Sequence, residues 1–400
     1  MEKQKSNHPI LKTFAFIICL VLGFAVSFVA VAWINLPESY EIPEKVSGSL
    51  PNLADGELDV ERIKEQDLSI HFLELGNKYT GDCTFIKVGN TEMLIDAGSR
   101  TSSVPVISSY IDKYCTDGIL EYVVVTHAHQ DHYAGFATPN GTDSIFDLYK
   151  VNLIIEFAKT NKSNTATMQA NYIREKSEAK DKNNNQTKVV TALDCVNETN
   201  DAQRTYELSS NINFTVLYHE FYENVAESEN DYSVCLMVNQ TTSLGSKHYL
   251  FTGDLEEDGE ESLVNSARNE GYLHEVEVYK AGHHGSKTSS SEALLKKFKP
   301  KKICVCCCAG SSEYTSKNEN QFPTQIFINR VAEFANTDQI FVTSLCTDYK
   351  NAQFTSMNGN IVVSCSFTTG VAYVNCSNNT TILKDTEWFK ENRIKPSQWE

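Results

Sequence analysis

A dense cluster of potential metal ligands follows an apolar segment in the first half of the chain. Residues 121–125 (EYVVV) predict a buried strand, and residues 126–132 (THAHQDH) carry three histidines and one aspartate. Side chains so close in sequence converge on one or two divalent ions only where the chain turns, because a helix or a straight strand would spread them apart. We therefore predict a metal site at a strand end. Its nitrogen and oxygen ligands are typical of a site that leaves room for water.

Two later segments place the same kinds of ligand at the ends of predicted strands. Residues 251–255 (FTGDL) end in a Gly-Asp pair, where an aspartate can bridge two cations, and residues 280–286 (KAGHHGS) carry a histidine pair. The chain has 10 histidines in 400 residues. Half of them fall in the two histidine clusters, so a chance gathering of surface histidines is not favoured.

Short β-type runs occur near both ends of the chain, with helical patterns between several of them. The runs at 68–75, 83–89 and 92–96 are separated by short polar breaks and predict an antiparallel meander. Further strands are predicted at 121–127, 151–156, 214–220, 233–238, 248–254, 275–282, 302–308 and 339–345, and helices near 103–115, 165–180, 257–270, 289–299 and 324–335. This order predicts a layered α/β domain with two sheets and helices outside them.

These motifs resemble those of the metallo-β-lactamase-fold hydrolases, and within them the metallo-hydrolase domain of the DNA-uptake competence protein ComEC. The closer resemblance lies in LSIHFLELGNKYTGDCTFI, LIDAG, THAHQDHYAG, NDYS, FTGDL, KAGHHGSKTSSSEALLKKFKP and a late VTS followed by NGNI at 358–361. It covers about residues 68–365. It implies a four-layer αββα sandwich over residues 67–368, followed by a C-terminal strand and tail over 369–400.

The resemblance also implies two divalent ions, Zn or Mn, with ligands carried over residue by residue. The implied ligands are His127 and His129 for the first ion, Asp131 and His132 for the second, Asp254 as the bridge, and one of His283 and His284. We prefer His283 because it follows Gly282 directly at the strand end, and His284 remains the alternative.

This sequence departs from the related pattern in two places. Many members supply a further histidine between the first motif and the Gly-Asp pair, and the interior candidates in this chain are His219 and His248. His219 is better placed, at the end of a predicted strand, but a packed or surface residue is an equally good interpretation. Where ComEC-like sequences have a His-Pro pair, this chain has Phe322-Pro323.

The predicted ligands favour hydrolysis by a metal-activated water. Divalent ions lower the pKa of bound water from 15.7 towards about 7, and they neutralise charge on the attacked oxygen. Asp131 is expected to orient this nucleophile, and Ser286 to contact substrate oxygens. We therefore expect a phosphodiesterase or nuclease that acts on a small phosphodiester or on single-stranded nucleic acid. The alternatives are an ester, lactone or β-lactam hydrolase, and a non-catalytic component of a DNA-uptake or cell-envelope assembly.

The N-terminal segment predicts a membrane anchor or a signal sequence. Residues 14–34 are 21 residues without a charge, about enough to span the ~30 Å of a bilayer core as a helix. Lysines precede this segment and glutamates follow it, which predicts a cytoplasmic N-terminus and an extracytoplasmic catalytic domain. We assign residues 1–36 to the stub and the anchor or signal, and residues 37–66, rich in proline and acidic residues, to a linker. The protein would be secreted if the segment is cleaved.

The charge balance limits which substrates the protein can bind broadly. The chain carries a net charge of −17, and the segment before residue 38 is positive, so the remainder is more acidic than the whole. Broad adhesion to nucleic acid is therefore not expected, whereas binding of one phosphate at a metal site is compatible with this charge. The lysine-rich segment 296–302 is best explained as a solvated helix C-terminus.

The 12 cysteines do not predict a disulfide framework, because their spacing is irregular and the chain is long enough to bury a core without cross-links. Four of them, at 304 and 306–308, lie in an apolar predicted strand, which indicates buried packing rather than a redox or zinc site.

Overall fold

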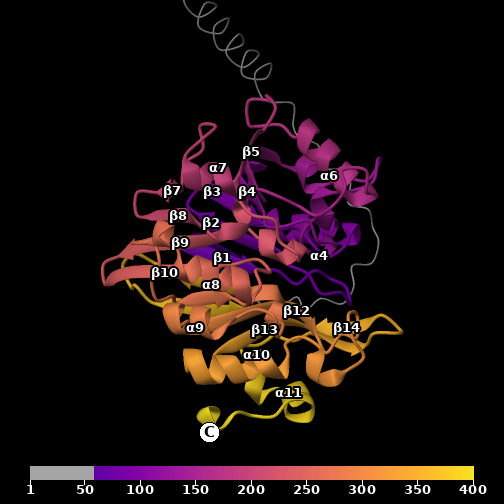
Figure 1. The fold of residues 1–400 in the computed structure, drawn as a ribbon, viewed down its shortest axis with the longest axis vertical. Helices are drawn as coiled ribbons and strands as arrows, with labels where there is room; N and C mark the ends of the chain where they lie inside the picture. The colour runs from indigo at the N-terminus through magenta and orange to yellow at the C-terminus, as the bar shows by residue number, and fades with distance from the viewer. Residues whose placement is uncertain (1–57) are drawn as a thin grey trace, which may run out of the picture. The chain divides into compact units, whose positions relative to one another are not determined.

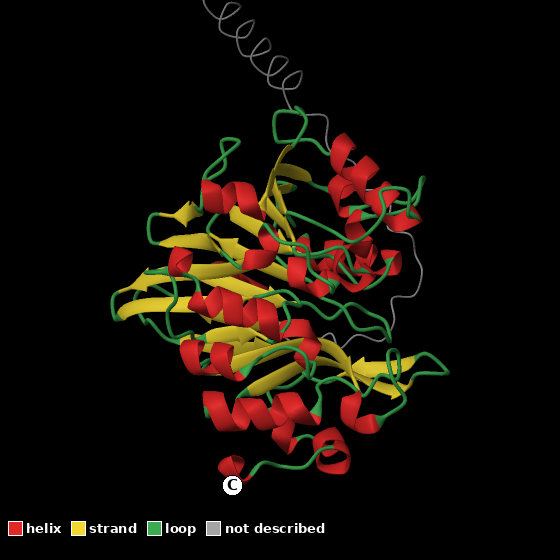
Figure 2. Ribbon diagram, in the orientation of Figure 1, coloured by secondary structure: helices red, strands yellow, loops and turns green. Residues whose placement is uncertain are grey.

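The computed structural model of the protein describes residues 58–400, which form two eight-stranded sheets (Figures 1 and 2). In spatial order, the first sheet contains β16 (Ala372–Cys376), β15 (Ile361–Cys365), β1 (Leu68–Phe72), β2 (Thr84–Val88), β3 (Thr91–Ile95), β4 (Ile119–Val125), β5 (Lys150–Glu156) and β6 (Lys188–Thr191). The second contains β14 (Gln353–Ser356), β13 (Ile340–Asp348), β12 (Lys302–Ala309), β11 (Val278–Lys280), β10 (Gly245–Phe251), β9 (Cys235–Thr242), β8 (Ile212–Leu217) and β7 (Thr205–Ser209).

Each sheet combines antiparallel and parallel pairs. β1, β2 and β3 pair antiparallel, which confirms the predicted meander, and β4, β5 and β6 extend the first sheet in parallel. In the second sheet, β10, β11, β12 and β13 are parallel, and nearly every residue of β11 and β12 is buried. This burial is expected for parallel strands covered on both faces. The loops after β10, β11 and β12 therefore leave the sheet at the same edge.

Two apolar cores hold the layers together. The first joins the two sheets, where the rings of Phe72 on β1 and Phe251 on β10 stack with centroids 6.2 Å apart, and it also includes Ile107 of α3. The second packs the second sheet against helices, for example Val305 of β12 and Leu295 of α9. The helices are α2 (Val60–Lys64), α3 (Val104–Ile111), α4 (Gln130–Tyr133), α5 (Ile145–Leu148), α6 (Thr167–Glu178), α7 (Ala192–Asn197), α8 (Glu257–Asn265), α9 (Glu292–Phe298), α10 (Gln325–Arg330) and α11 (Glu387–Asn392). The predicted α/β domain with two packed sheets and outer helices is confirmed.

The lysine-rich segment is the end of α9 and the loop that follows it. Lys299 ends the helix in the left-handed backbone conformation. The Nζ atoms of Lys299 and Lys301 lie 2.7 and 2.6 Å from carboxylate oxygens of Glu275 and Glu277. These carboxylates compensate part of the positive charge, and the structure confirms that the segment is a helix C-terminus.

The cysteines in the described residues are all free thiols. Cys304 and Cys306 pack in the first core and Cys307 packs in the second, as the alternation of side chains along β12 requires. Cys308 is also buried. The prediction of buried packing in this strand, without disulfides, is confirmed.

The predicted anchor or signal and most of the predicted linker lie outside the described residues. The last part of the linker, within residues 58–66, contains α2, whose Ile63 is buried in the first core. Over residues 58–400, none of the helices combines the length and apolar character needed to cross a membrane. At the other end, the predicted C-terminal strand corresponds to β16, and the tail returns to the second core through Phe389 and Trp399.

Candidate metal centre

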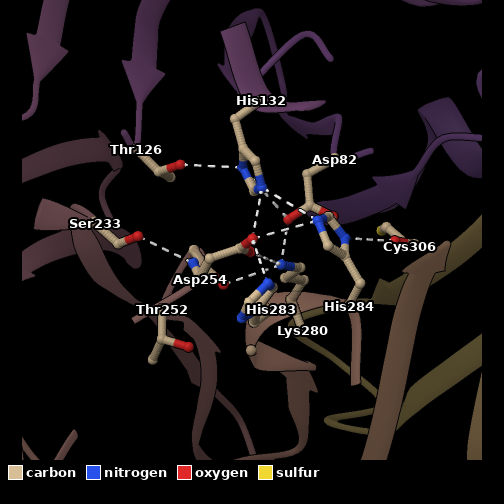
Figure 3. A network of polar contacts seen from close by, with 12 residues as sticks. Asp82, Thr126, His132, Ser233, Thr252, Asp254, Lys280, His283, His284 and Cys306 are labelled. Atoms are coloured by element: carbon tan, nitrogen blue, oxygen red, sulfur yellow. Dashed lines mark hydrogen bonds and ion pairs between the residues drawn. The ribbon is translucent and has the colours of Figure 1, made fainter. Parts of the chain in front are cut away.

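Loops from both sheets meet at one polar centre, drawn in Figure 3. β4 leads into the histidine cluster, β10 leads into Asp254, and β11 leads into the histidine pair. The turn of α4 begins after His129 and brings Asp131 and His132 back towards the strand end. The three motifs that the sequence placed at strand ends therefore come together.

Four buried side chains form the middle of this centre: Asp82, His132, Asp254 and His284. Each offers one nitrogen or carboxylate oxygen, and these four atoms lie within 4.8 Å of one another, so the group could hold a metal ion. The Nε2 atoms of His132 and His284 lie 3.1 and 3.3 Å from Asp254 Oδ2, and 3.3 Å from each other (Figure 3).

Hydrogen bonds on the far side of both imidazoles fix their orientation. His132 Nδ1 lies 2.7 Å from Asp96 Oδ2, and His284 Nδ1 lies 2.8 Å from the carbonyl oxygen of Cys306. A carboxylate and a carbonyl can only accept, so Nδ1 is the donor in both rings. Nε2 therefore points to the centre, which is the arrangement typical of metal-ligating histidines.

The buried carboxylates of the centre strongly raise the pKa values of the imidazoles of His132 and His284. Burial alone lowers the pKa of His132, but the carboxylates of Asp254, Asp96 and Asp82 outweigh it and raise that pKa to about 10. Burial and carboxylates oppose each other in the same way at His284, whose pKa is raised. The carboxylates thus require positive charge between them, which protons on the imidazoles or a divalent cation can supply.

Asp82 and Asp96 are residues of this centre that the sequence did not single out. Both lie in segments quoted for the resemblance, GDC and LIDAG, but neither was assigned a role. Asp82 forms a buried ion pair with Lys280, and Asp96 also accepts hydrogen bonds from the amide and hydroxyl of Thr126, at 2.8 and 2.7 Å. A second Gly-Asp pair besides the one at Asp254 is the signal that could have identified Asp82.

His127 and His129 form a neighbouring pair beside His132. His127 Nε2 lies 3.1 Å from His129 Nδ1, and the rings of His127 and His132 have centroids 4.2 Å apart. The hydroxyls of Thr126 and Ser233 lie 3.1 and 3.3 Å from His127 Nδ1. The structure thus brings together all the imidazoles of the first motif.

The histidine pair is divided between two environments. His284 is fully buried in the four-residue group, whereas His283 is partly exposed, with Nε2 3.9 Å from Asp254 Oδ2 and Nδ1 3.5 Å from Glu256 Oε1. Both residues have left-handed backbone angles, and this conformation turns the two rings in different directions. The sequence favoured His283 as the ligand, but His284 is the histidine that lies among the four converging side chains.

The two interior histidines lie apart from this group. His219 is buried, and its Nε2 donates a hydrogen bond of 2.8 Å to the carbonyl oxygen of Ser233. Its Nδ1 has no hydrogen-bond partner in the described residues. Nδ1 of His248, on β10, lies 2.8 Å from Oδ1 of Asn239, on β9. Neither belongs to the four-residue group.

Asp131 contacts a residue of the four-residue group directly, whereas the hydroxyl of Ser286 contacts Thr288. Asp131 Oδ2 lies 3.4 Å from His284 Nε2 and accepts a hydrogen bond of 2.7 Å from the hydroxyl of Tyr314. Ser286 is buried, and its hydroxyl lies 3.1 Å from the hydroxyl of Thr288. Its role as a substrate contact stays a prediction.

The residues present fit a divalent cation. Asp254 Oδ1 is buried without a hydrogen-bond partner, and its ion-pair contact is the Nζ atom of Lys280 at 3.5 Å, so this oxygen can still accept a metal–ligand bond. The donors are imidazole nitrogens and carboxylate oxygens, a set that suits Zn or Mn.

Comparisons with known proteins agree with this description. ComE operon protein 3 of Bacillus subtilis is 36% identical over 61 residues, which are 15% of this chain and 7% of that protein. Recombination protein 2 of Haemophilus influenzae is 34% identical over 76 residues, which are 19% of this chain and 8% of that protein. The chain therefore spans less than a tenth of either curated relative.

Several solved structures of metallo-β-lactamase-fold proteins are also similar. The metallo-β-lactamase fold protein YhfI from Bacillus subtilis matches with 11% identity and a TM-score of 0.34, over 69% of this chain and 85% of that one. A diphosphatase of the PhnP family matches with 12% identity and a TM-score of 0.30, over 59% and 85%. The predicted resemblance to ComE-type proteins is confirmed by the two curated sequence matches.

A family match covers most of the described domain. Residues 74–321 match the family described as "Anti-Pycsar protein Apyc1", and this range includes every residue of the candidate metal centre. The matched residues make up more than half of the chain, and the chain belongs to the Anti-Pycsar protein Apyc1 family.

Proposed function

We propose that this protein is a metal-dependent hydrolase of phosphodiester bonds that uses two divalent ions, Zn or Mn. The observation that carries the proposal is the group of His132, His284, Asp82 and Asp254, with Nε2 of both imidazoles turned towards one carboxylate. His127 and His129 would hold the first ion, and Asp131, His132 and His284 the second, with Asp254 between them. Bound ions of this kind lower the pKa of water and stabilise charge on a phosphoryl oxygen.

The chain's own residues supply orientation around this site. Asp131 would accept a hydrogen bond from the attacking water, and this role is supported by its Oδ2, which lies 3.4 Å from His284 Nε2 and accepts from the hydroxyl of Tyr314. Asp96 and the carbonyl of Cys306 keep the two imidazoles facing inward. Burial of the group excludes bulk water, which strengthens these electrostatic interactions.

A single phosphodiester is the substrate class that fits the charge of the molecule. Two cations in the centre would attract one phosphate, whereas the net charge of −17 opposes broad contact with a polyanion. Both a small phosphodiester and a single-stranded nucleic acid belong in the substrate panel, because each can bring one phosphate to the proposed ions.

Metal content tests the site directly. Replacing both His127 and His129 by alanine should remove at least one of the two proposed ions, which is about half or more of the metal found by elemental analysis, because two ligands of one ion are lost together. His274→Ala is a matched control, since His274 is exposed and stacks on His248 away from the centre. Full metal content and activity in the double variant would rule out the assignment.

A substrate panel tests the reaction. The metal-loaded full chain in detergent should hydrolyse bis(p-nitrophenyl) phosphate or a cyclic mononucleotide with Mn²⁺ or Zn²⁺, and comparison with single-stranded DNA separates the two substrate classes. Turnover of esters, lactones or β-lactams alone would replace the proposal by another hydrolase of the same fold. A metal-replete protein inert on the whole panel would indicate a non-catalytic assembly component.

We further propose that the N-terminal segment places the catalytic domain outside the cytoplasm, as a single-pass anchor or as a cleaved signal. The support is the uncharged stretch at 14–34 with lysines before it and glutamates after it. Protease added to intact cells should then digest the catalytic domain, or the domain should appear in the medium. Protection from protease until the cells are lysed would contradict this location.

A further inference from the structure

Two aromatic rings stand directly beside the candidate metal centre. The centroid of the Phe322 ring lies 5.7 Å from the ring centroids of His283, His284 and Tyr314. Tyr314 is 57% exposed, although its hydroxyl reaches Asp131 Oδ2 at 2.7 Å. One end of this side chain thus contacts the buried centre while its ring faces solvent. We call Tyr314 and Phe322 the aromatic wall.

The aromatic wall is held in place by contacts to the loop that carries Asp82. Glu313, next to Tyr314, accepts hydrogen bonds from the Thr80 amide at 2.9 Å and from Arg100 Nη2 at 2.8 Å. Glu313 is itself only slightly exposed, so these bonds are shielded from water. Tyr314 therefore has a fixed position relative to the centre, and a ligand would not have to order it.

The chemistry of the aromatic wall selects for a flat apolar group. An exposed ring of this kind offers stacking energy without a charge requirement, and stacking of one aromatic base on such a side chain contributes about 1–3 kcal/mol. The guanidinium of the nearby Arg100 is already paired with Glu313. It therefore fits one planar substituent rather than a long polyanion.

We propose that Tyr314 and Phe322 form the substrate-binding wall that receives a planar aromatic or heteroaromatic substituent of the phosphodiester. This inference rests on the proposed function. It makes the two side chains specificity-determining residues: the phosphate lies in the metal centre, and the ring of the substrate stacks on the wall.

Binding of two phosphonates that cannot be hydrolysed tests this inference without turnover. Calorimetry on the metal-loaded full chain should give a Kd for phenylphosphonate about tenfold or more below that for methylphosphonate, since 1.4 kcal/mol corresponds to tenfold. Tyr314→Leu and Phe322→Leu should each reduce this ratio to about one third or less of its wild-type value. Tyr314→Phe should keep the ratio because it keeps the ring and removes only the hydroxyl.

The controls distinguish loss of the aromatic wall from loss of phosphonate binding at the metal centre. The Kd for methylphosphonate reports on the centre in every variant, and Tyr373→Leu removes an exposed ring from β16 as a matched surface control. Equal Kd values for the two phosphonates in the wild type, or a ratio that survives both leucine variants, would overturn the inference. Binding of neither phosphonate would instead contradict the proposed function.

Discussion

At the scale of single residues, the candidate metal centre depends on side chains that orient its ligands from outside the four-residue group. Asp96 lies behind His132, where its Oδ2 accepts from Nδ1 at 2.7 Å and its carboxylate also accepts from the Thr126 amide. It thus sets which nitrogen of His132 carries the proton. The same side chain fixes the start of the histidine motif to the end of β3.

Replacing Asp96 by asparagine should weaken metal binding without removing a proposed ligand. The amide is nearly isosteric, but it can present NH₂ to His132 Nδ1 and so favour the other tautomer. Loss of such an outer hydrogen bond typically reduces metal affinity 10–100-fold. Titration against a competing chelator measures this change, and an unchanged Kd would show that Asp96 has only a packing role.

The sequence could identify most of the centre but not Asp82 and Asp96. The histidines and Asp131 are recognisable because they are close in sequence and follow a strand. Asp82 and Asp96 precede that motif by tens of residues, and only the pairing of β2, β3 and β4 brings them to it. The sequence could not decide between His283 and His284 either, because the orientation of their rings depends on the left-handed backbone of both residues.

At the scale of secondary-structure elements, the strongly apolar segments were predictable and the polar edges were not. Most central strands contain runs of apolar, buried residues, and such runs can be recognised in the sequence. β6, β7 and β14 were not predicted, because each is short, lies at a sheet edge and has exposed positions. β15 is an exception among the apolar strands, because it was not predicted although all of its residues are buried. Such strands form because a neighbour offers hydrogen bonds, which a local apolar pattern does not reveal.

The contact between β1 and α3 should make the stability of the domain sensitive to acid. His71 is fully buried on β1, with its nitrogens 2.8 Å from the hydroxyls of Tyr110 on α3 and of Ser69. Burial, assisted by the charge of Lys87, lowers the pKa of His71 from 6.5 to about 3. Between these two values the unfolded chain binds a proton that the folded chain does not, so acid favours unfolding.

The free energy of unfolding should therefore fall as the pH is lowered from 6.5, by up to about 1.4 kcal/mol per pH unit from this residue. His71→Gln can still bond to the two hydroxyls but does not titrate, so its stability should fall less over the same range. Urea unfolding at several pH values measures the difference between wild type and variant. Parallel pH profiles would mean that His71 is not the group responsible.

The crossing of two loops at Gly98 should tolerate no side chain. A Cβ on Gly98 would lie 1.7 Å from the carbonyl oxygen of Asp131, and backbone atoms cannot move aside as a flexible side chain can. Gly98→Ala should thus lower both the melting temperature and the metal content. Gly141→Ala is the control: its φ of +81° makes alanine strained, but the space around it is open, so a loss of about 1 kcal/mol is expected. Equal melting temperatures for the two variants would contradict this explanation.

At the scale of the whole molecule, charge and site act on substrates in opposite directions. The net charge of the chain is −17, whereas the proposed ions concentrate positive charge at one buried group. In the lysine-rich segment at the end of α9, carboxylates partly compensate the positive charge, because Lys296, Lys299 and Lys301 pair with them. A long polyanion should therefore be repelled by most of the surface even when one of its phosphates reaches the centre.

This balance predicts an unusual response to salt. Raising the ionic strength from about 0.01 M to about 0.15 M shortens the Debye length from about 30 Å to about 8 Å, which screens repulsion between the acidic surface and distant phosphates. The KM for a single-stranded oligonucleotide should then fall, while the KM for bis(p-nitrophenyl) phosphate, which carries one charge, should change much less. Proteins that bind nucleic acid through lysine and arginine contacts behave in the opposite way, because salt competes with their phosphate contacts. A KM for the oligonucleotide that rises steeply with salt would reveal a cationic track and would favour a nuclease acting on long strands over an enzyme for small phosphodiesters.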